Sequence, residues 1–210
     1  WTHIGLADTQ HIGKIAVDPH DPNVLLVAAI GHLYAPNTER GVFRSRDGGK
    51  SWQKVLYKNA DVGAVEVVID PTNSKVVYAG LWNTRRPPWF THSPTNGPGG
   101  GIYKSVDGGS TWKELSNGLP KEGIGRTGIA VAASNPRRLY AMVDCLVADS
   151  ATAGAAPDST AGTTIARSVP RQGGFFRSDD AGETWKRLSS DESLWGRGWY
   201  FEKLAVDPKN

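Results

Sequence analysis

An eight-residue pattern occurs three times in this chain of 210 residues and constrains its fold more than any other feature. It reads SRDGGKSW at residues 45–52, SVDGGSTW at 105–112 and SDDAGETW at 178–185. Each copy follows a short apolar stretch (GVFR, GIYK or GFFR) that is typical of a β-strand. Because self-similarity at a regular interval indicates a repeat architecture, we expect the chain to stack copies of one small unit.

A second element recurs between the copies of the first. It begins IAVDP at residue 15, VVIDP at 67, IAVAASNP at 129 and LAVDP at 204, and each complete copy continues into another apolar stretch. Each complete copy predicts a strand, a turn rich in Asp, Pro and Asn, and a second strand. The unit therefore has four short strands. Intervals of 51, 60 and 73 residues separate Trp1, Trp52, Trp112 and Trp185, which suits one four-stranded propeller blade with loop insertions.

The predicted fold class is all-β: a β-propeller segment of four-stranded antiparallel blades, about three blades plus partial strands at both ends. Residues 1–210 are expected to form part of a single propeller domain. The last strand of a preceding blade lies near 1–8, the repeats near 9–57, 58–116 and 117–190, and the start of a further blade near 199–210. We expect the remaining blades of a longer chain, or a second copy, to cover the end blades.

Composition excludes several classes of function. No apolar run of about 18 residues could span a membrane. The single Cys145 excludes an intrachain disulfide, and the formal charge of +3 comes from scattered Lys and Arg residues that form no stripe for nucleic acid. His11 and His32 have no partner at metal-ligand spacing, so neither a metal nor a cofactor is predicted.

The repeated pattern itself is interpreted as a structural turn. Paired glycines supply backbone angles that other residues resist, the Asp carboxylate accepts hydrogen bonds from loop amides, and the Trp packs between blades. In the third copy Ala181 replaces a glycine, so a different turn geometry is expected there. The structural residues are Ser45, Asp47, Gly49 and Trp52; Ser105, Asp107, Gly109 and Trp112; and Ser178, Asp180, Gly182 and Trp185.

The pattern S-x-D-x-G-x-[ST]-W resembles the Asp-box, or BNR repeat, of sialidases, sortilin-type receptor domains and xyloglucan-degrading glycosidases. The longer arrangement HIGKIAVDP, GHLYAPNTERGVFRSRDGG, GLWNTRRPPW and GIYKSVDGGSTWKELSNGLP is similar to a group of large exported bacterial BNR-repeat proteins labelled sortilin-like or glycosyl hydrolase-like. This resemblance covers nearly the whole chain except the segment 148–167, which is interpreted as a surface loop insertion. It implies an exported protein, whether periplasmic, cell-surface or secreted.

Functional residues are expected on one face of the propeller. The joins between strands two and three, and from strand four to the next blade, lie on the same face and carry all the long irregular sequences. Aromatic and cationic side chains gather in two of these joins, where rings could stack on a sugar and guanidinium groups could hold polar oxygens. The candidate ligand-binding residues are Trp82, Arg85, Arg86, Trp89, Phe90, His92, Trp195, Arg197, Trp199 and Tyr200.

Two functions of different class fit this pattern. The favoured interpretation is a binding scaffold for a glycan, peptide or protein; the alternative is a glycosidase-type hydrolase acting on a polysaccharide. The alternative needs paired carboxylates, and no catalytic pair is identified among the acids on or near the irregular loops. These acids are Glu39, Asp61, Glu66, Glu122 and Asp144. The arginine triad of sialidases cannot be traced, and His32 stands where the xyloglucan-degrading enzymes suggest an acid.

Overall fold

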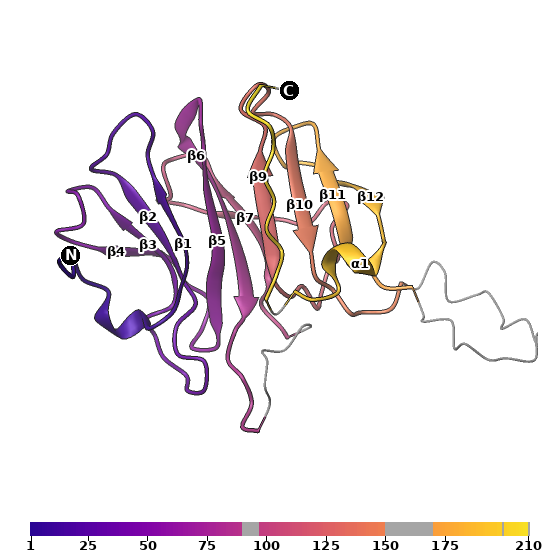
Figure 1. Cartoon of the computed structure of the whole chain (residues 1–210), viewed down its shortest axis with the longest axis horizontal. Helices are drawn as coiled ribbons and strands as arrows, with labels where there is room; N and C mark the ends of the chain where they lie inside the picture. The colour runs from indigo at the N-terminus through magenta and orange to yellow at the C-terminus, as the bar shows by residue number, and fades with distance from the viewer. Residues whose placement is uncertain (90–96, 150–169, 199, 210) are drawn as a thin grey trace, which may run out of the picture.

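Three four-stranded antiparallel sheets make up the regular structure of the described chain. The computed structural model describes residues 1–89, 97–149, 170–198 and 200–209. Within each sheet, strands that are consecutive in sequence pair with one another, and the three sheets stand side by side in Figure 1. The blades are β1 (Ile12–Val17), β2 (Leu25–Ala29), β3 (Gly41–Ser45) and β4 (Gln53–Leu56); β5 (Val62–Asp70), β6 (Asn73–Asn83), β7 (Gly101–Ser105) and β8 (Lys113–Leu115); and β9 (Thr127–Val131), β10 (Leu139–Val143), β11 (Gly174–Ser178) and β12 (Lys186–Ser189).

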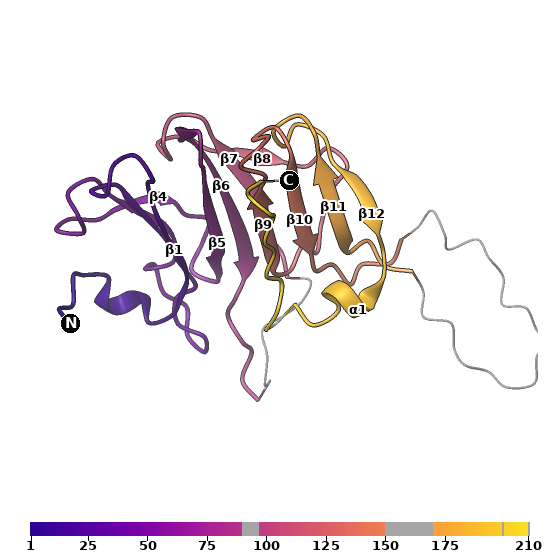
Figure 2. The same cartoon turned by 45° about the horizontal axis from the view of Figure 1, so that its top comes forward.

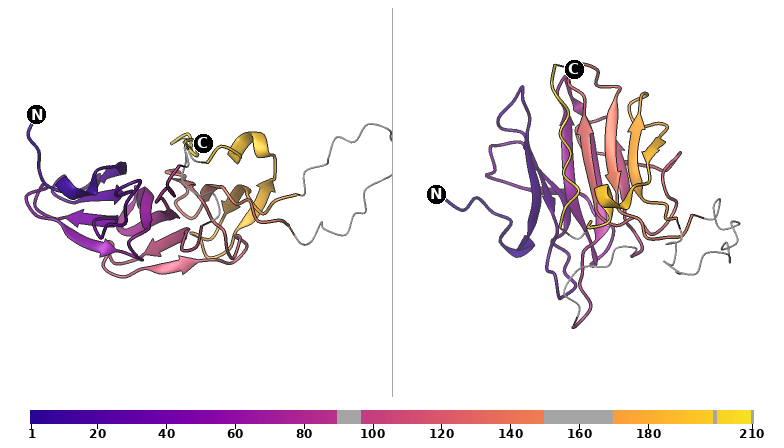
Figure 3. Two further views of the ribbon diagram at one scale, coloured as in Figure 1. Left: turned by 90° about the horizontal axis from the view of Figure 1, so that it is seen from below. Right: turned by 45° about the vertical axis from the view of Figure 1, so that its right-hand side comes forward.

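Little helix accompanies these strands in the described residues. A 3-10 turn spans Ala7–Thr9 and one short helix, α1, spans Glu192–Trp195. No helix among these residues is long and apolar enough to cross a membrane. The sheets follow one another along a curve when seen from below, with the C-terminal segment on the concave side (Figure 3). The predicted all-β propeller class is confirmed.

Apolar side chains between neighbouring blades form the core. One cluster joins Leu26 and Val42 of the first blade to Val67 and Leu81 of the second. A second cluster joins Tyr78 and Ile102 of the second blade to residues of the third that include Leu139 and Phe176. Each buried aliphatic side chain of this size contributes about 1.5–3 kcal/mol relative to exposure, so blade stacking supplies the main driving force for folding.

The innermost strands β1 and β5 carry bulges. The pairing register shifts between Ile12 and Lys14 on β1 and between Ala64 and Glu66 on β5. A bulge turns the following side chain in a new direction. The Nζ atom of Lys14 lies 2.5 Å from Oε1 of Glu66, so the side chains after the two bulges form an ion pair between blades one and two.

The Asp-box turns share one hydrogen-bond arrangement. In the first, the Ser45 hydroxyl donates to Asp47 Oδ1 at 2.7 Å and accepts from the N–H of Gly49 at 2.8 Å. The Ser51 N–H and hydroxyl then donate to the two oxygens of Asp47. The other two turns repeat these contacts, and Ser178 Oγ accepts from the N–H of Gly182 at 2.9 Å. In each turn, one buried serine hydroxyl and one carboxylate thus accept the hydrogen bonds of the turn N–H groups.

These hydrogen bonds also set the acidity of the Asp-box carboxylates. Donation from the Ser51 hydroxyl and N–H lowers the pKa of Asp47 to about 2, and donation from Thr184 lowers the pKa of Asp180 to about 2. Thr111 acts in the same way on the pKa of Asp107, which lies well below its ordinary value. The ionised carboxylates therefore stabilise the fold above the ordinary value of 3.8, and this contribution is lost as the pH falls through about 2.

The expectation of a different geometry at Ala181 was wrong. Its φ of 61° matches the values of 71° at Gly48 and 70° at Gly108. The N–H of Ala181 donates to the carbonyl of Arg137 at 2.7 Å, as the N–H of Gly108 donates to Lys75 at 2.8 Å. The surrounding hydrogen bonds hold alanine in the left-handed conformation that glycine adopts more readily.

The Asp-box turns also connect successive blades. Arg44 on β3 donates to the carbonyl of Gly108 at 2.6 Å and to the Ser110 hydroxyl at 3.0 Å. The Tyr78 hydroxyl on β6 donates to the carbonyl of Ala181 at 3.1 Å. Each of these turns therefore receives side-chain hydrogen bonds from the preceding blade, and we call this end of the sheets the Asp-box face.

The opposite end of the sheets is the irregular face. In Figures 1 and 2 the described parts of the β6–β7 and β10–β11 joins and α1 lie at the lower end of the sheets, whereas the β5–β6 turn and the C-terminus lie at the upper end. The short turns and the long joins are thus separated as the strand order predicted.

Replacing the central Asp-box serine tests the turn arrangement. Ser105→Ala leaves the buried N–H of Gly109 without an acceptor, so the free energy of unfolding should fall by about 1–3 kcal/mol in denaturant titration. Ser190→Ala, at an exposed serine, is the matched control and should change little. Equal stability of the two variants would contradict the role given to the serine hydroxyl.

Two glycine substitutions separate backbone strain from steric conflict. A Cβ at Gly108 meets no atom within 4 Å, whereas a Cβ at Gly118 collides with the backbone of Trp185, although both glycines have positive φ. Gly108→Ala should therefore cost only the left-handed strain, roughly 1 kcal/mol, and Gly118→Ala clearly more. Thermal unfolding of the two variants compares these costs. An equal loss of stability would show that the space available for the Cβ atom does not determine the cost.

Candidate functional site

A buried arginine organises the irregular face between blades one and two. Arg40 is 0% exposed, and its guanidinium donates to the carbonyls of His32 at 2.6 Å, Ala35 at 2.9 Å and Ile30 at 3.0 Å. It also donates to the Thr84 hydroxyl at 2.8 Å, at the end of β6. Arg40 therefore fixes the β2–β3 join against the neighbouring blade, and sequence reasoning did not single it out.

Exposed rings and a cation lie above this buried support. The N–H of Arg86 donates to the carbonyl of Leu33, and its guanidinium lies 5.9 Å from the ring centre of Tyr34. Tyr34 is 62% exposed, and Trp89 is fully exposed with a φ of 70°. We call Tyr34 and Arg86, together with Trp89 three residues further along the same join, the aromatic platform. A ring face and a guanidinium in this setting can stack on a sugar and bind its oxygens.

The structure brings only part of the predicted residue set to this surface. The side chain of Arg85 pairs with Asp61, with Nε 2.5 Å from Oδ1, and Arg197 and Tyr200 are exposed. Trp82 is 2% exposed and Trp195 is 1% exposed. Because both rings are buried, neither has an exposed face on which a ligand could stack. The expectation that Trp82 and Trp195 bind a ligand is therefore corrected. Phe90, His92 and Trp199 lie outside the described residues.

Tyr34 is the platform member that sequence reasoning missed. It stands in GHLYAPNTER, a join that was assigned to the irregular face without a candidate being chosen from it. The signal was available, because this was the one large ring in the join. Only the contact with Arg86, 52 positions away in the chain, associates it with the other candidates.

The histidines make local hydrogen bonds. His11 Nδ1 lies 3.2 Å from the carbonyl of Gly31, and His32 Nε2 lies 3.1 Å from Asp8 Oδ1. Across the described ranges, no group of three His, Cys, Asp or Glu side chains is arranged to hold a metal ion.

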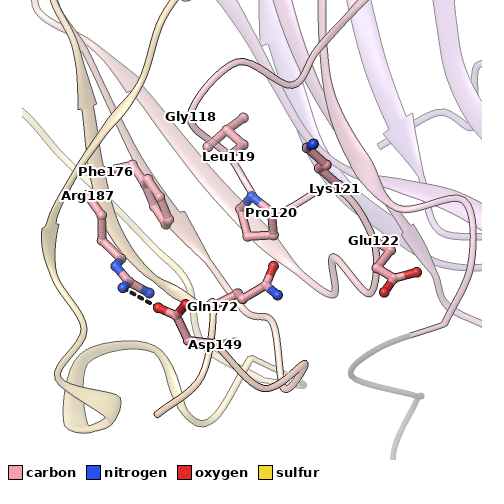
Figure 4. Close-up of a pocket in the computed structure, with 9 residues that line it drawn as sticks. All are labelled: Gly118, Leu119, Pro120, Lys121, Glu122, Asp149, Gln172, Phe176 and Arg187. Atoms are coloured by element: carbon pink, nitrogen blue, oxygen red, sulfur yellow. Dashed lines mark hydrogen bonds and ion pairs between the residues drawn. The ribbon is translucent and has the colours of Figure 1, made fainter. Parts of the chain in front are cut away.

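A depression of about 720 Å³ lies on the irregular face between blades two and three (Figure 4). One wall is the β8–β9 join, and the other is the base of the β10–β11 join. Arg187 Nη2 lies 2.6 Å from Oδ2 of Asp149, and Gln172 Nε2 donates to the carbonyl of Ala148 at 3.0 Å. The lining residues are Gly118, Leu119, Pro120, Lys121, Glu122, Asp149, Gln172, Phe176 and Arg187. This size is within the range of small-molecule sites.

The acids divide into paired and buried groups. Lys54 contacts Glu39 at 2.9 Å, and Lys14 contacts Glu66. Asp144 is 1% exposed, and burial raises its pKa to about 7 even though the charge of Arg171 opposes the shift. Burial likewise raises the pKa of Glu202, which is 3% exposed, to about 9; the charge of Asp144 adds to the rise, and Arg126 opposes it.

Glu202 was also missed by sequence reasoning, although a signal existed. When the inner strands are aligned on IAVDP, VVIDP and LAVDP, Glu202 takes the place of the bulge residues Gly13 and Val65. An acid at a position occupied by glycine and valine in other repeats is an anomaly that the sequence displays. Its burial beside Asp144 depends on the tertiary structure.

The role of Arg40 gives a stability prediction. Arg40→Met removes all of the guanidinium hydrogen bonds and leaves the buried Thr84 hydroxyl and several half-buried carbonyls without this donor, so the free energy of unfolding should fall by about 2–3 kcal/mol. Arg46→Met, at an exposed arginine in the first Asp-box turn, should change it by less than about 0.5 kcal/mol. Chemical denaturation of both variants measures the difference, and similar losses would argue against the buried network.

Comparisons with known proteins agree with this geometry. The family model "BNR/Asp-box repeat" matches residues 43–54 and 176–187. A xyloglucanase of Acetivibrio thermocellus is 25% identical over 197 residues, which cover 89% of this chain and 21% of that protein. A xyloglucanase of Hypocrea jecorina is 28% identical over 132 residues, which cover 56% of this chain and 14% of that protein. The chain thus spans about a fifth or less of the length of these relatives.

Solved structures give the same fold. The GH74 xyloglucanase from Xanthomonas campestris aligns with a TM-score of 0.58 at 18% identity over 95% of this chain and 26% of that chain. An ancestral GH74 enzyme aligns with a TM-score of 0.56 at 16% identity over 90% of this chain and 20% of that chain. The two xyloglucanase relatives favour the hydrolase alternative over the binding scaffold that sequence reasoning preferred, whereas the solved structures show the fold alone. The repeated turns, the matching family model and the shared fold together show that this chain forms blades of a β-propeller built from BNR/Asp-box repeats.

Proposed function

We propose that this protein is a glycosidase-type propeller acting on a polysaccharide of the xyloglucan kind, and that the described chain contributes glycan contacts from its irregular face. The observation that carries the proposal is the aromatic platform, in which exposed Tyr34 lies beside the Arg86 guanidinium and exposed Trp89 follows three residues later in the same join. A flat ring stacks on the C–H face of a pyranose, and a guanidinium donates to its oxygens. The xyloglucanase relatives supply the substrate class.

Four of the five acids named from the sequence fit a structural or binding role better than acid–base catalysis, and the fifth, Glu122, is exposed and lines the depression of Figure 4. A catalytic carboxyl group must reach the glycosidic oxygen or the anomeric carbon. Asp144 and Glu202 are buried, and Lys54 and Arg85 engage Glu39 and Asp61. We therefore assign the described residues to substrate binding. A polysaccharide is an extracellular substrate, so we expect the protein to be exported, as its resemblance to exported BNR-repeat proteins implies.

The depression between blades two and three is a second place for a glycan branch. In Figure 4 the side chains of Gln172 and Asp149 border the space opposite Pro120 and Lys121. An amide, a carboxylate and an ammonium group can exchange hydrogen bonds with sugar hydroxyls, while Pro120 and Leu119 supply an apolar wall. Both surfaces lie on the irregular face, so one branched chain could contact both.

Removing the most exposed ring of the platform tests the proposal. Trp89→Ala should weaken binding of xyloglucan oligosaccharides by about 1–3 kcal/mol, because a stacked aromatic anchor is lost. Titration calorimetry measures the change. The matched control is Trp1→Ala, which removes an equally exposed ring at the N-terminus and should leave the affinity unchanged.

Binding measured against several polysaccharides distinguishes the proposed substrate from other glycans. Xyloglucan should bind more tightly than mannan or pectin, and a reducing-sugar assay on the same mixtures reports any hydrolysis. Binding without hydrolysis supports the assignment of these residues to substrate contacts. Failure of the wild-type chain to bind xyloglucan, or unchanged affinity in Trp89→Ala, would contradict it.

A further inference from the structure

Two buried acids meet where blade three contacts the segment that follows α1. Asp144 follows β10, and Glu202 belongs to residues 200–206, which run beside β9 in Figures 1 and 2. A Cβ at Gly128 of β9 would collide with the carbonyl oxygen of Glu202, so the two backbones are in close contact. Gly198 packs in the same way against the side chain of Asp144. Both carboxyl groups therefore belong to one interface.

The polar atoms of this interface lack hydrogen-bond partners among the described residues. They are Oδ2 of Asp144 and both carboxyl oxygens of Glu202. An ionised carboxylate without partners is costly to bury, whereas a protonated carboxyl group is neutral and gains an O–H donor. Closure of the interface is therefore favoured when the acids carry protons.

The surrounding charges only partly offset burial. Arg126, at the start of β9, attracts the ionised form of Glu202, and Arg171 attracts that of Asp144. Arg126 also attracts the carboxylate of Glu66, which in turn pairs with Lys14 of β1. Burial still dominates at both acids, and their mutual repulsion adds to it at Glu202.

We propose that Asp144 and Glu202 form a proton-dependent latch, which holds residues 200–206 against blade three while the acids are protonated and releases them on ionisation. The backbone supports this, because Glu202 has a φ of 108°, in the left-handed region that non-glycine residues avoid. Opening relieves this strain. The aligned positions on β1, β5 and β9 are Gly13, Val65 and Thr127, so only this inner strand brings an acid to the position.

The direction of the pH dependence follows from the raised pKa values. The latch is fully stabilised below the ordinary values of 3.8 and 4.5, where the acids are protonated in both the closed and the open form. As the pH rises, the open form loses protons first, and the closed form retains them up to about 7 at Asp144 and about 9 at Glu202. Each released proton changes the ratio of open to closed chains by up to about tenfold per pH unit.

Hydrogen exchange of the whole chain, read by mass spectrometry over residues 196–206, tests the latch. Protection factors corrected for intrinsic exchange should fall by at least about tenfold between about pH 5 and about pH 9, while those of β6 stay constant. Glu202→Gln, which mimics the protonated acid, should lose less protection than wild type between these pH values, because only Asp144 still titrates. Asp207→Asn, at an exposed acid on the same segment, is the matched control and should behave as wild type.

Three outcomes would overturn the proposal. Wild-type protection that is independent of pH excludes a proton-dependent latch, and protection that rises with pH indicates an ion pair with Arg126 instead. An unchanged pH dependence in Glu202→Gln excludes Glu202 as the titrating group. If that variant does not fold, Asp144→Asn takes its place, and it should show a weaker pH dependence than wild type; an equal one contradicts the proposal.

Discussion

The hydrogen bond from the Asp-box serine to its aspartate is the interaction on which the rest of the structure depends. It closes a turn that contains two residues in left-handed conformation and leaves the turn carbonyls free to accept from the preceding blade. Local closure and blade-to-blade connection therefore use the same few atoms. A repeat that fixes both the turn and the contact with the next blade can be stacked many times, because every blade offers the same packing surface to its neighbour.

Placing the rigid connections at one end of the sheets frees the other end to vary. At the irregular face no repeated hydrogen-bond pattern fixes the joins, and a different side chain supports each one. The buried guanidinium of Arg40 donates to the β2–β3 join, and Arg187 pairs with Asp149 at the base of the β10–β11 join. Such supports tolerate different loop sequences above them. This explains how the aromatic platform and the depression of Figure 4 can occupy neighbouring blades with no sequence in common.

The proposed latch makes one inter-blade contact responsive to pH. Lys14 and Glu66, on neighbouring inner strands, form a matched ion pair. Asp144 and Glu202, where β9 contacts residues 200–206, have no such counter-charge pairing. Burial raises the pKa of both, so that Glu202 stays protonated near neutral pH and Asp144 is partly protonated there. A propeller whose contacts differ in this way can be stable at most blade interfaces and adjustable at one of them.

The sequence by itself determined the four-stranded unit, the order of its strands and the separation of short turns from long joins, because these follow from local periodicity and turn chemistry. It could not determine which aromatic residues are exposed: Trp82 and Trp89 were predicted in one join, yet Trp82 is buried on strand β6 and Trp89 is exposed. It also failed at Ala181, whose backbone is set by hydrogen bonds to Arg137 and Tyr78, and it missed Tyr34 and Glu202. These outcomes depend on contacts between residues far apart in the chain, which only the packing of one blade against the next brings together.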